Sequence, residues 1–336
     1  MTRLRDVIDD DIISDHELTK SLRTQGALQQ VFFKALDEFL FLSFYHNEDR
    51  SIRDRARLLC ISEGDSSWLS AIPNPKKFSY LNKSQFCSVF KYWYGIPCQV
   101  PRKCRCGRDM DIWGDHALSC KSGGGVVHRH NTIQRVLLGF CADAGMEPLK
   151  ELSDYRLHAK DRIGDLVLPY EDHGRELLVN VTCWNPLYSP RLNMSSVSPL
   201  HTVKMAHKDK TDKRNLDDDN RIDTQFGRLK YMPFAVDTFG GRTSQANDLL
   251  RRIAQELAVK QAKPFSECFA LVKMRVSIAI QVGVAVCLLI RNIDARLHQE
   301  DPVALLEEGF CDSLLDQEYF SDEEEGLLIE DEFDLP

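Results

Sequence analysis

Residues 163–183 read Ile-Gly-Asp-Leu-Val-Leu-Pro-Tyr-Glu-Asp-His-Gly-Arg-Glu-Leu-Leu-Val-Asn-Val-Thr-Cys and contain two short apolar runs. The runs cover 163–168 and 177–183, and the turn-like residues 171–174 lie between them. Short apolar runs that flank a polar, glycine-containing turn are typical of a β-hairpin. We therefore predict two antiparallel strands in this stretch.

The length of the turn predicts which residues of the two strands face each other. If residues 171–174 form a four-residue loop, Tyr170 pairs with Arg175 and Asp165 comes opposite Asn180. Directly paired residues on one face have Cβ atoms about 4.5–5.5 Å apart, so carboxylates at both positions would share one divalent cation. Such a site serves metal-dependent phosphodiester hydrolysis. Because position 180 is Asn, an amide oxygen is available but one negative charge is missing; the alternative is that Asp165 is an ordinary exposed or capping acid.

The patterns around this hairpin predict two further helical stretches and a third strand. Apolar residues recur at helical spacing from Ile133 and stop at Gly145, where a glycine commonly ends a helix. A third strand is expected at 232–239, and the chain is expected to be helical from there to about Arg296. The predicted fold class is α+β.

The N-terminal third is expected to be helical as well. Apolar residues recur at helical spacing between positions 28 and 42, and Ser14 with Glu17 fits a capping box. A second helix is expected at 83–93, followed by a linker at 97–103. A helix with one apolar face normally buries it, so we expect these helices to pack into a core of their own.

The charge of the chain is divided unevenly along its length. The net charge is −8, but residues 297–336 contain fifteen carboxylates and no Lys or Arg, which leaves residues 1–296 with a charge of +7. A segment of like charges with little apolar surface is typical of disorder. The mildly basic remainder is compatible with nucleic acid as a partner.

The sequence predicts neither secretion nor a membrane span. Residues 2–10 lack the apolar core of a signal peptide. The longest apolar run, 276–290, has fifteen residues, fewer than the roughly 20 that span a bilayer, and we expect it to form a buried helix. We expect a nuclear or cytoplasmic location with no membrane partner, where the eleven cysteines remain reduced thiols or bind metal.

Three cysteines and one histidine have a spacing typical of a small metal knuckle. Cys104, Cys106, His116 and Cys120 follow the pattern Cys-x-Cys-x9-His-x3-Cys. Three thiolates and one imidazole form a standard tetrahedral set for structural zinc, although the first pair is closer than the usual two to four intervening residues. The alternative is a group of ordinary buried cysteines near a surface histidine. Residues 101–135 also contain seven Lys or Arg and three acids, an excess that suits a phosphate backbone.

Several stretches occur in an order that resembles a known family. They are Ala56-Arg57-Leu58-Leu59, Trp68-Leu69-Ser70-Ala71-Ile72-Pro73, Cys104-Arg105-Cys106-Gly107, Gly114-Asp115-His116-Ala117-Leu118-Ser119-Cys120-Lys121, Arg129-His130-Asn131, Arg162-Ile163-Gly164-Asp165, Pro233-Phe234-Ala235-Val236-Asp237-Thr238-Phe239-Gly240 and Ser277-Ile278-Ala279-Ile280-Gln281. The series, over about residues 55–296, resembles the C-terminal region of reverse-transcriptase polyproteins of non-LTR-like retroelements. In that family a Cys-Cys-His-Cys knuckle precedes a restriction-enzyme-like endonuclease of the PD-(D/E)XK group.

The resemblance implies a small mixed sheet flanked by helices and a set of catalytic residues, and together with the patterns above it gives a domain organisation. The domains would be a helical region (1–100), a zinc knuckle (101–125), a restriction-endonuclease-like domain (126–296) and an acidic disordered tail (297–336). The implied catalytic residues are Asp165, which would bind Mg²⁺ or Mn²⁺, with Asn180, Thr182, Lys210 and Lys213. The basic stretch around the knuckle and the Arg-His-Asn stretch give the candidate nucleic-acid-binding residues, which are Arg102, Lys103, Arg105, Lys121, Arg129, His130 and Asn131.

Two functions follow from these observations. The first is a retroelement-derived, endonuclease-like protein that binds DNA or RNA, in which metal-dependent nicking is weak or lost because the second metal carboxylate is Asn180. The second is a non-enzymatic scaffold that keeps the fold and recruits basic proteins through its acidic tail. The sequence contains no Tyr-x-Asp-Asp or Phe-x-Asp-Asp polymerase signature.

Overall fold

The computed structural model describes residues 25–74, 80–153, 162–170, 175–214, 221–224 and 227–297. It is a mixed α and β structure, as predicted, and it is built around a five-stranded sheet. The predicted capping box at Ser14 and Glu17 and the acidic segment 298–336 lie outside the described residues.

The sheet has the strand order β3-β4-β5-β7-β6. The strands are β3 (Leu149–Ser153), β4 (Arg162–Tyr170), β5 (Arg175–Trp184), β6 (Arg221–Thr224) and β7 (Gly227–Asp237), and only the β5–β7 pair is parallel. The β4–β5 register runs from Tyr170↔Arg175 to Leu166↔Val179, which confirms the predicted hairpin. The predicted third strand is β7, whereas β3 and β6 were not predicted.

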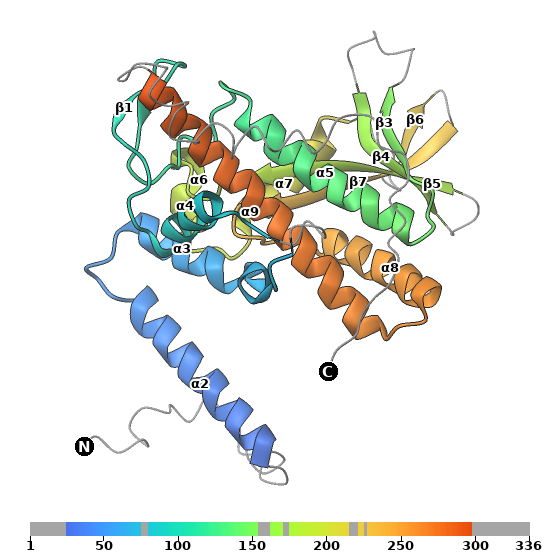
Figure 1. Cartoon of the computed structure of the whole chain (residues 1–336), viewed down its shortest axis with the longest axis horizontal. Helices are drawn as coiled ribbons and strands as arrows, with labels where there is room; N and C mark the ends of the chain where they lie inside the picture. The colour runs from blue at the N-terminus through green and yellow to red at the C-terminus, as the bar shows by residue number, and fades with distance from the viewer. Residues whose placement is uncertain are drawn as a thin grey trace.

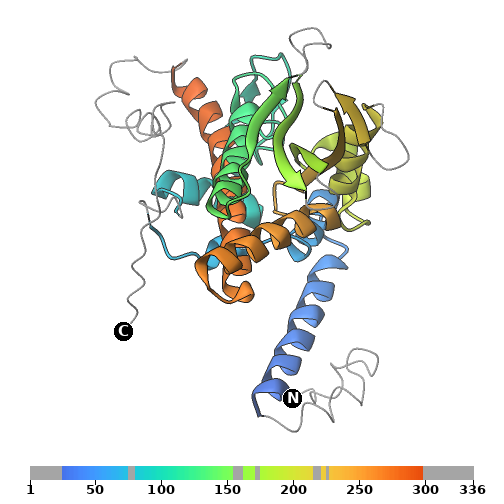
Figure 2. The ribbon, with the colours of Figure 1, turned by 90° about the vertical axis from the view of Figure 1, so that its right-hand side faces the viewer.

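Helices cover both faces of this sheet (Figures 1 and 2). The helices α5 (Gly125–Asp143), α8 (Ser244–Gln261) and α9 (Phe265–Leu297) lie on one side, and α6 (Ser189–Ser195) and α7 (His201–Asp212) lie on the other. The side chains of β5 alternate accordingly, since Val179 joins the core with α5 and α9 while Leu178 packs with Val167 on the opposite face.

The N-terminal helices share this core instead of forming one of their own. The N-terminal elements are α3 (Ile52–Ser62), η2 (Ser67–Ser70) and α4 (Lys83–Tyr94). Of these, η2 and α4 pack against α9. Tyr92, Leu118 and Ile280 belong to a single buried cluster. One core therefore includes side chains from all three folded regions that the sequence suggested.

The first described helix, α2 (Gln25–Tyr45), extends away from the body (Figures 1 and 2). The predicted helix is confirmed, but its predicted burial is wrong, because Leu36, Phe39 and Leu42 are exposed. Its C-terminal end is attached to the body, where the Tyr45 hydroxyl donates a hydrogen bond to the Ser196 carbonyl. Helical periodicity alone does not say whether an apolar face has a partner.

The long apolar helix α9 forms the centre of the helical layer. Within it, Phe265–Arg291 is long and apolar enough to cross a membrane by length and composition, but 72% of its most apolar window is buried inside the protein. Val276, Ile280 and Val284 are completely buried. The predicted buried helix at 276–290 is confirmed.

Candidate metal centres

Three thiols and one imidazole converge beside the small hairpin formed by β1 (Arg102–Lys103) and β2 (Asp109–Met110). The ligand atoms of Cys104, Cys106, His116 and Cys120 all lie within 4.8 Å of one another. The Sγ atoms of Cys104 and Cys120 are 3.8 Å apart, and Cys106 Sγ is 3.3 Å from His116 Nε2. This group, the Cys/His cluster, could hold a metal ion.

Local backbone structure brings the four ligands together. Gly107, with φ of +83°, allows the tight turn that separates the two members of the first pair from β2. Asp111 accepts hydrogen bonds from the backbone N–H groups of Trp113, Asp115 and His116. The Cys120 N–H then donates to the His116 carbonyl, so both ligands of the second pair lie on one helical turn.

Burial and hydrogen bonds shift the pKa values of three of the four ligands. A backbone hydrogen bond from Arg108 lowers the pKa of the exposed Cys106 thiol. Burial lowers the pKa of His116 because it disfavours the charged imidazolium, while burial raises the pKa of Cys104. A neutral imidazole and an easily ionised thiol are the forms that bind metals.

Arg129 joins this cluster to the sheet and does not lie on a nucleic-acid surface. Its side chain is 2% exposed, and its guanidinium donates to the carbonyls of Leu118 and Cys183. The predicted role of Arg129 in nucleic-acid binding is therefore wrong, since a phosphate cannot reach it. Arg129 instead ties the turn that carries the Cys/His cluster to the C-terminal end of β5.

A second group of polar side chains lies where β4 and β5 separate. The β4–β5 pairing ends at Leu166↔Val179, and the next residues along the two strands are Asp165 and Asn180. Val167 and Leu178 are directly paired and pack together on the α7 face, and Asn180, two residues beyond Leu178 on β5, points to that face as well. The Asp165 side chain instead reaches the Val181 N–H of β5 and His130 of α5. We call Asp165, Asn180, His130 and Lys210 the Asp165 site.

The carboxylate of Asp165 is held by the neighbouring strand and by α5. Its Oδ2 accepts a hydrogen bond of 2.6 Å from the Val181 N–H, and its Oδ1 lies 3.2 Å from His130 Nε2. The Gln134 side chain donates to the Asp165 carbonyl at 2.7 Å. His130 and Gln134 are four residues apart and so lie on one face of α5, a signal that the sequence analysis missed.

Gly164 lets β4 and β5 approach closely beside Asp165. A Cβ atom at this position would lie 2.5 Å from a methyl group of Leu178 and 3.2 Å from the Val179 carbonyl oxygen. Any larger residue would push the two strands apart. The close approach of the two strands therefore explains why a glycine precedes Asp165 in the Ile-Gly-Asp sequence.

Two predicted residues of β5 are buried on the α7 face. Asn180 is 6% exposed, and among the described residues its Oδ1 has no hydrogen-bond donor. Thr182, two residues further along the strand, is also 6% exposed. A buried carbonyl oxygen without a donor usually costs free energy, and such an oxygen is a suitable ligand for a cation.

The structure separates the two lysines that the resemblance implied. Burial lowers the pKa of Lys210, and the negative charge of Asp165 acts against this shift, so the ammonium group lies within electrostatic reach of the site. Lys213 is exposed, and its Nζ pairs with Asp209 one helical turn away, at 2.7 Å. Of the two, Lys210 is thus the one placed toward Asp165.

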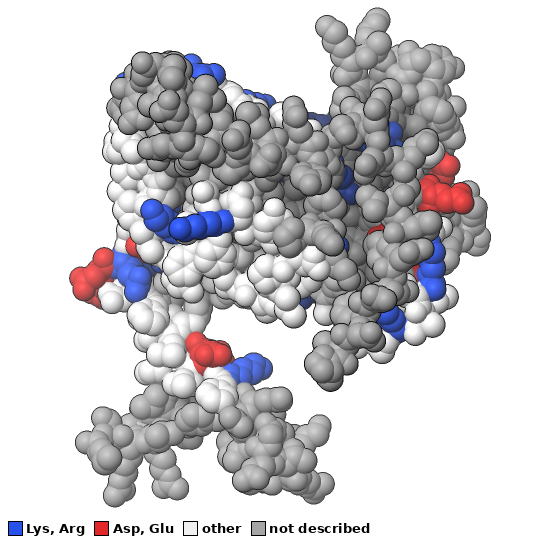
Figure 3. All heavy atoms as spheres, in the orientation of Figure 1, with Lys and Arg blue, Asp and Glu red and all other residues white. Residues whose placement is uncertain are grey.

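The other candidate nucleic-acid-binding residues lie mainly at the surface. Lys103, Arg105, Lys121 and Asn131 are exposed and Arg102 is half-buried, while Lys103 pairs with Asp109 at 2.6 Å. On the face shown in Figure 3, Lys and Arg side chains of the described part are scattered among uncharged ones. On that face, the Lys and Arg side chains of the described part do not form a continuous basic band.

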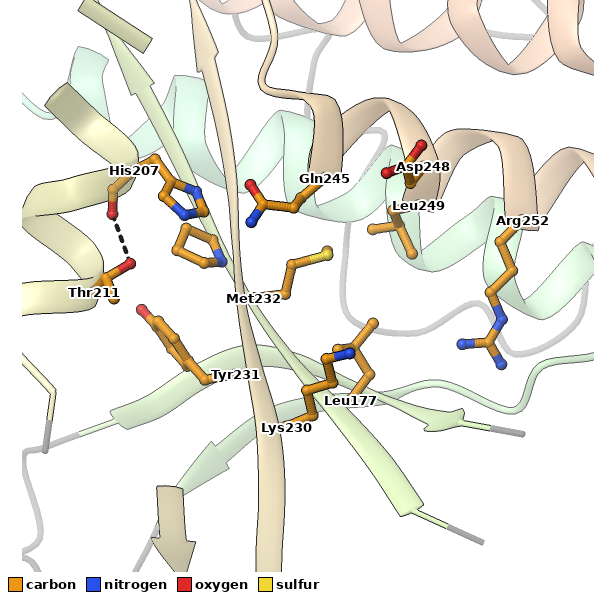
Figure 4. A pocket seen from close by; sticks show the side chains of 11 residues that line it. Leu177, His207, Thr211, Lys230, Tyr231, Met232, Gln245, Asp248, Leu249 and Arg252 are labelled. Carbon is orange, nitrogen blue, oxygen red and sulfur yellow. Dashed lines mark hydrogen bonds between the residues drawn. The ribbon is translucent and has the colours of Figure 1, made fainter. Parts of the chain in front are cut away.

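A cavity of about 320 Å³ lies beside β7, between α7 and α8 (Figure 4). His207 and Thr211 come from α7, Gln245 and Asp248 from α8, and Tyr231 from β7. Asp165, Asn180 and Lys210 do not line it. The cavity and the Asp165 site are therefore different features.

Comparison with known proteins does not assign the chain to a family. No protein-family model matches it, and neither does any curated protein or any solved structure.

Proposed function

We propose that the chain is an endonuclease-like protein that binds DNA or RNA and has weak or no metal-dependent nicking activity. The observation that supports this most strongly is the β4–β5 register, in which Asp165 and Asn180 are the first residues beyond the last pair, Leu166↔Val179. The sequence resemblance to a restriction-enzyme-like retroelement endonuclease selects the same two positions independently.

The donor set at the Asp165 site fits a divalent cation. Asp165 offers a carboxylate oxygen, and the Asn180 Oδ1 is a buried oxygen without a donor in the described part of the chain. A bound divalent cation supplies an activated water and neutralises charge on a phosphate. The chain itself contributes the negative charge of Asp165 and the positive charge of Lys210, which would stabilise negative charge developing on the phosphate.

The substitution of a carboxylate by Asn180 explains why activity should be low. Two carboxylates attract a divalent cation more strongly than one carboxylate and one neutral amide, and the amide is also the poorer ligand for Mg²⁺. We therefore expect the fold of the site to be kept and its affinity for Mg²⁺ to be reduced. Thr182 pairs with Ala235, which packs against α7, and we assign Thr182 a packing role beside the site.

We propose further that the Cys/His cluster binds structural zinc. In a tetrahedral site with Zn–S distances of about 2.3 Å, two sulfurs are about 3.8 Å apart, and the Cys104–Cys120 separation is 3.8 Å. Zinc would fix the loops that carry the exposed Arg105 and Lys121, which would contact the phosphate backbone together with Asn131. The scaffold function depends on segment 297–336, whose acidic residues lie outside the described residues.

A plasmid-nicking assay tests the proposed function. We expect the zinc-loaded protein to nick supercoiled plasmid slowly with Mg²⁺ or Mn²⁺, Asp165→Ala to abolish this activity, and Asn180→Asp to increase it. Lys210→Ala should reduce the remaining rate by about 10-fold or more, whereas the matched Lys213→Ala should change it little. Nicking that survives Asp165→Ala would contradict the site, and fast nicking by the natural protein would contradict the claim of impairment.

A further inference from the structure

We propose that His130 is a ligand of the cation at the Asp165 site, so that this site prefers a first-row transition ion such as Mn²⁺ over Mg²⁺. This inference rests on the proposed function, because it names the metal chemistry of the same site. It assigns to His130 a role different from the nucleic-acid contact that the sequence suggested.

The geometry places the two donor atoms at a suitable separation for one ion. His130 Nε2 lies 3.2 Å from Asp165 Oδ1. Two ligands that each lie about 2.1 Å from an octahedral ion, at right angles to one another, are about 3.0 Å apart. The side chain of His130 is 31% exposed and that of Asp165 is 11% exposed, so water can complete the coordination.

Contacts around the pair keep both donors in this arrangement. The Val181 N–H holds Oδ2 of Asp165, which leaves Oδ1 as the oxygen that faces the imidazole. One turn further along α5, Gln134 donates to the Asp165 carbonyl and fixes the helix against β4. Such supporting hydrogen bonds orient metal ligands.

The composition of the donor set determines which ion it favours. Asp165, Asn180 and His130 would provide one carboxylate, one amide oxygen and one imidazole nitrogen. Mg²⁺ prefers oxygen ligands and negative charge, whereas imidazole suits first-row transition ions. His130 would therefore supply a strong neutral donor where a second carboxylate is absent, at the expense of affinity for Mg²⁺.

The alternative is that His130 only donates a hydrogen bond to Asp165. In that case the imidazole would compete with a cation for Oδ1, and its removal would leave metal affinity unchanged or increase it. The two roles therefore predict opposite effects of the same substitution.

Metal binding by the full chain, with zinc loaded first and no nucleic acid present, separates these roles. Mn²⁺ affinity is measured by electron paramagnetic resonance of free Mn²⁺, and Mg²⁺ affinity by its competition with Mn²⁺. We expect His130→Ala to weaken Mn²⁺ binding about 10-fold or more and Mg²⁺ binding much less. The matched control is His128→Ala, because His128 is half-exposed on the same helix and contacts Thr132, one turn further along α5.

Each outcome of this experiment decides a separate claim. Unchanged or tighter Mn²⁺ binding in His130→Ala, with thermal unfolding as in the natural protein, would overturn the role of His130. If Asp165→Ala still weakened binding in that case, the proposed function would stand. Loss of binding in both variants but not in His128→Ala, even without detectable nicking, would support the ligand role. His130→Gln provides a second variant if His130→Ala does not fold.

Discussion

The Cys/His cluster and the Asp165 site gather their side chains in different ways. The cluster takes all four ligands from the seventeen residues between Cys104 and Cys120. The Asp165 site takes its residues from α5, β4, β5 and α7, which only the folded sheet brings together. A site such as the Asp165 site can keep its geometry when one carboxylate is replaced by a neutral side chain, because packing of the sheet and helices positions its residues.

The Cys/His cluster and the Asp165 site are connected through Arg129. The cluster therefore supports the position of the Asp165 site. Arg129 bridges the Leu118 carbonyl on the cluster side and the Cys183 carbonyl on β5. His130, the next residue, contacts Asp165. Loss of order in the cluster should therefore reach the Asp165 site through α5.

The largest expected effect comes from removing the zinc that we propose for the Cys/His cluster. Because metal binding to such a small loop contributes directly to folding, Cys120→Ser or chelation should lower the free energy of unfolding by more than about 5 kcal/mol. Thermal unfolding and metal content by mass spectrometry measure this effect. Cys87→Ser, at an exposed cysteine outside the cluster, is the control, and equal unfolding temperatures for the two variants would contradict the role of the cluster.

A smaller but still large effect is expected from Arg129→Met. The substitution leaves two buried carbonyls without their donor, which should cost about 3–5 kcal/mol. Chemical denaturation measures the loss, with Arg135→Met as the control because Arg135 is exposed on the same helix. A loss below about 1 kcal/mol would show that the two regions are not joined through Arg129.

A third prediction concerns Asp237, a buried acid at the end of β7. Asp237 is 2% exposed, and burial raises its pKa to about 6 although it accepts hydrogen bonds from the N–H groups of Phe239 and Gly241. A folded-state pKa above the unfolded value of about 3.9 means that this group stabilises the fold most below pH 4 and loses that contribution as the pH rises to 6. The loss amounts to about 3 kcal/mol at most.

Asp237→Asn tests this assignment. The variant should keep the two turn hydrogen bonds but should not lose stability as the Asp237 carboxyl ionises. The free energy of unfolding of Asp237→Asn should therefore rise relative to that of the natural protein between pH 4 and pH 6. Denaturant titrations at several pH values measure it. A difference that does not depend on pH would mean that Asp237 ionises as easily in the folded protein as in the unfolded chain.

The sequence predicted the elements whose patterns are local. The four-residue turn was enough to predict the β4–β5 register, and the apolar run at 276–290 was enough to predict a buried helix. The strands β3 and β6 were missed because they are short and carry several polar residues, so only their pairing with β4 and β7 makes them strands. The exposure of α2 was missed because periodicity identifies an apolar face but not its partner.

The same distinction applies to the candidate sites. The ligands of the Cys/His cluster could be chosen from their spacing, and Asp165 with Asn180 from the hairpin. Arg129 was misassigned because charged residues are usually exposed, and its burial arises where α5, β5 and the cluster meet. The contact of His130 with Asp165 could not be predicted from either residue alone, since α5 and β4 are brought together only by the tertiary fold.

The most direct test of the central claim is the Mg²⁺ affinity of Asn180→Asp, measured by isothermal titration calorimetry on the zinc-loaded protein. If Asp165 and position 180 share one cation, the restored carboxylate should tighten Mg²⁺ binding by about 10-fold or more, and adding Asp165→Ala should remove the gain. An unchanged affinity, or a gain that persists without the Asp165 carboxylate, would contradict the shared site.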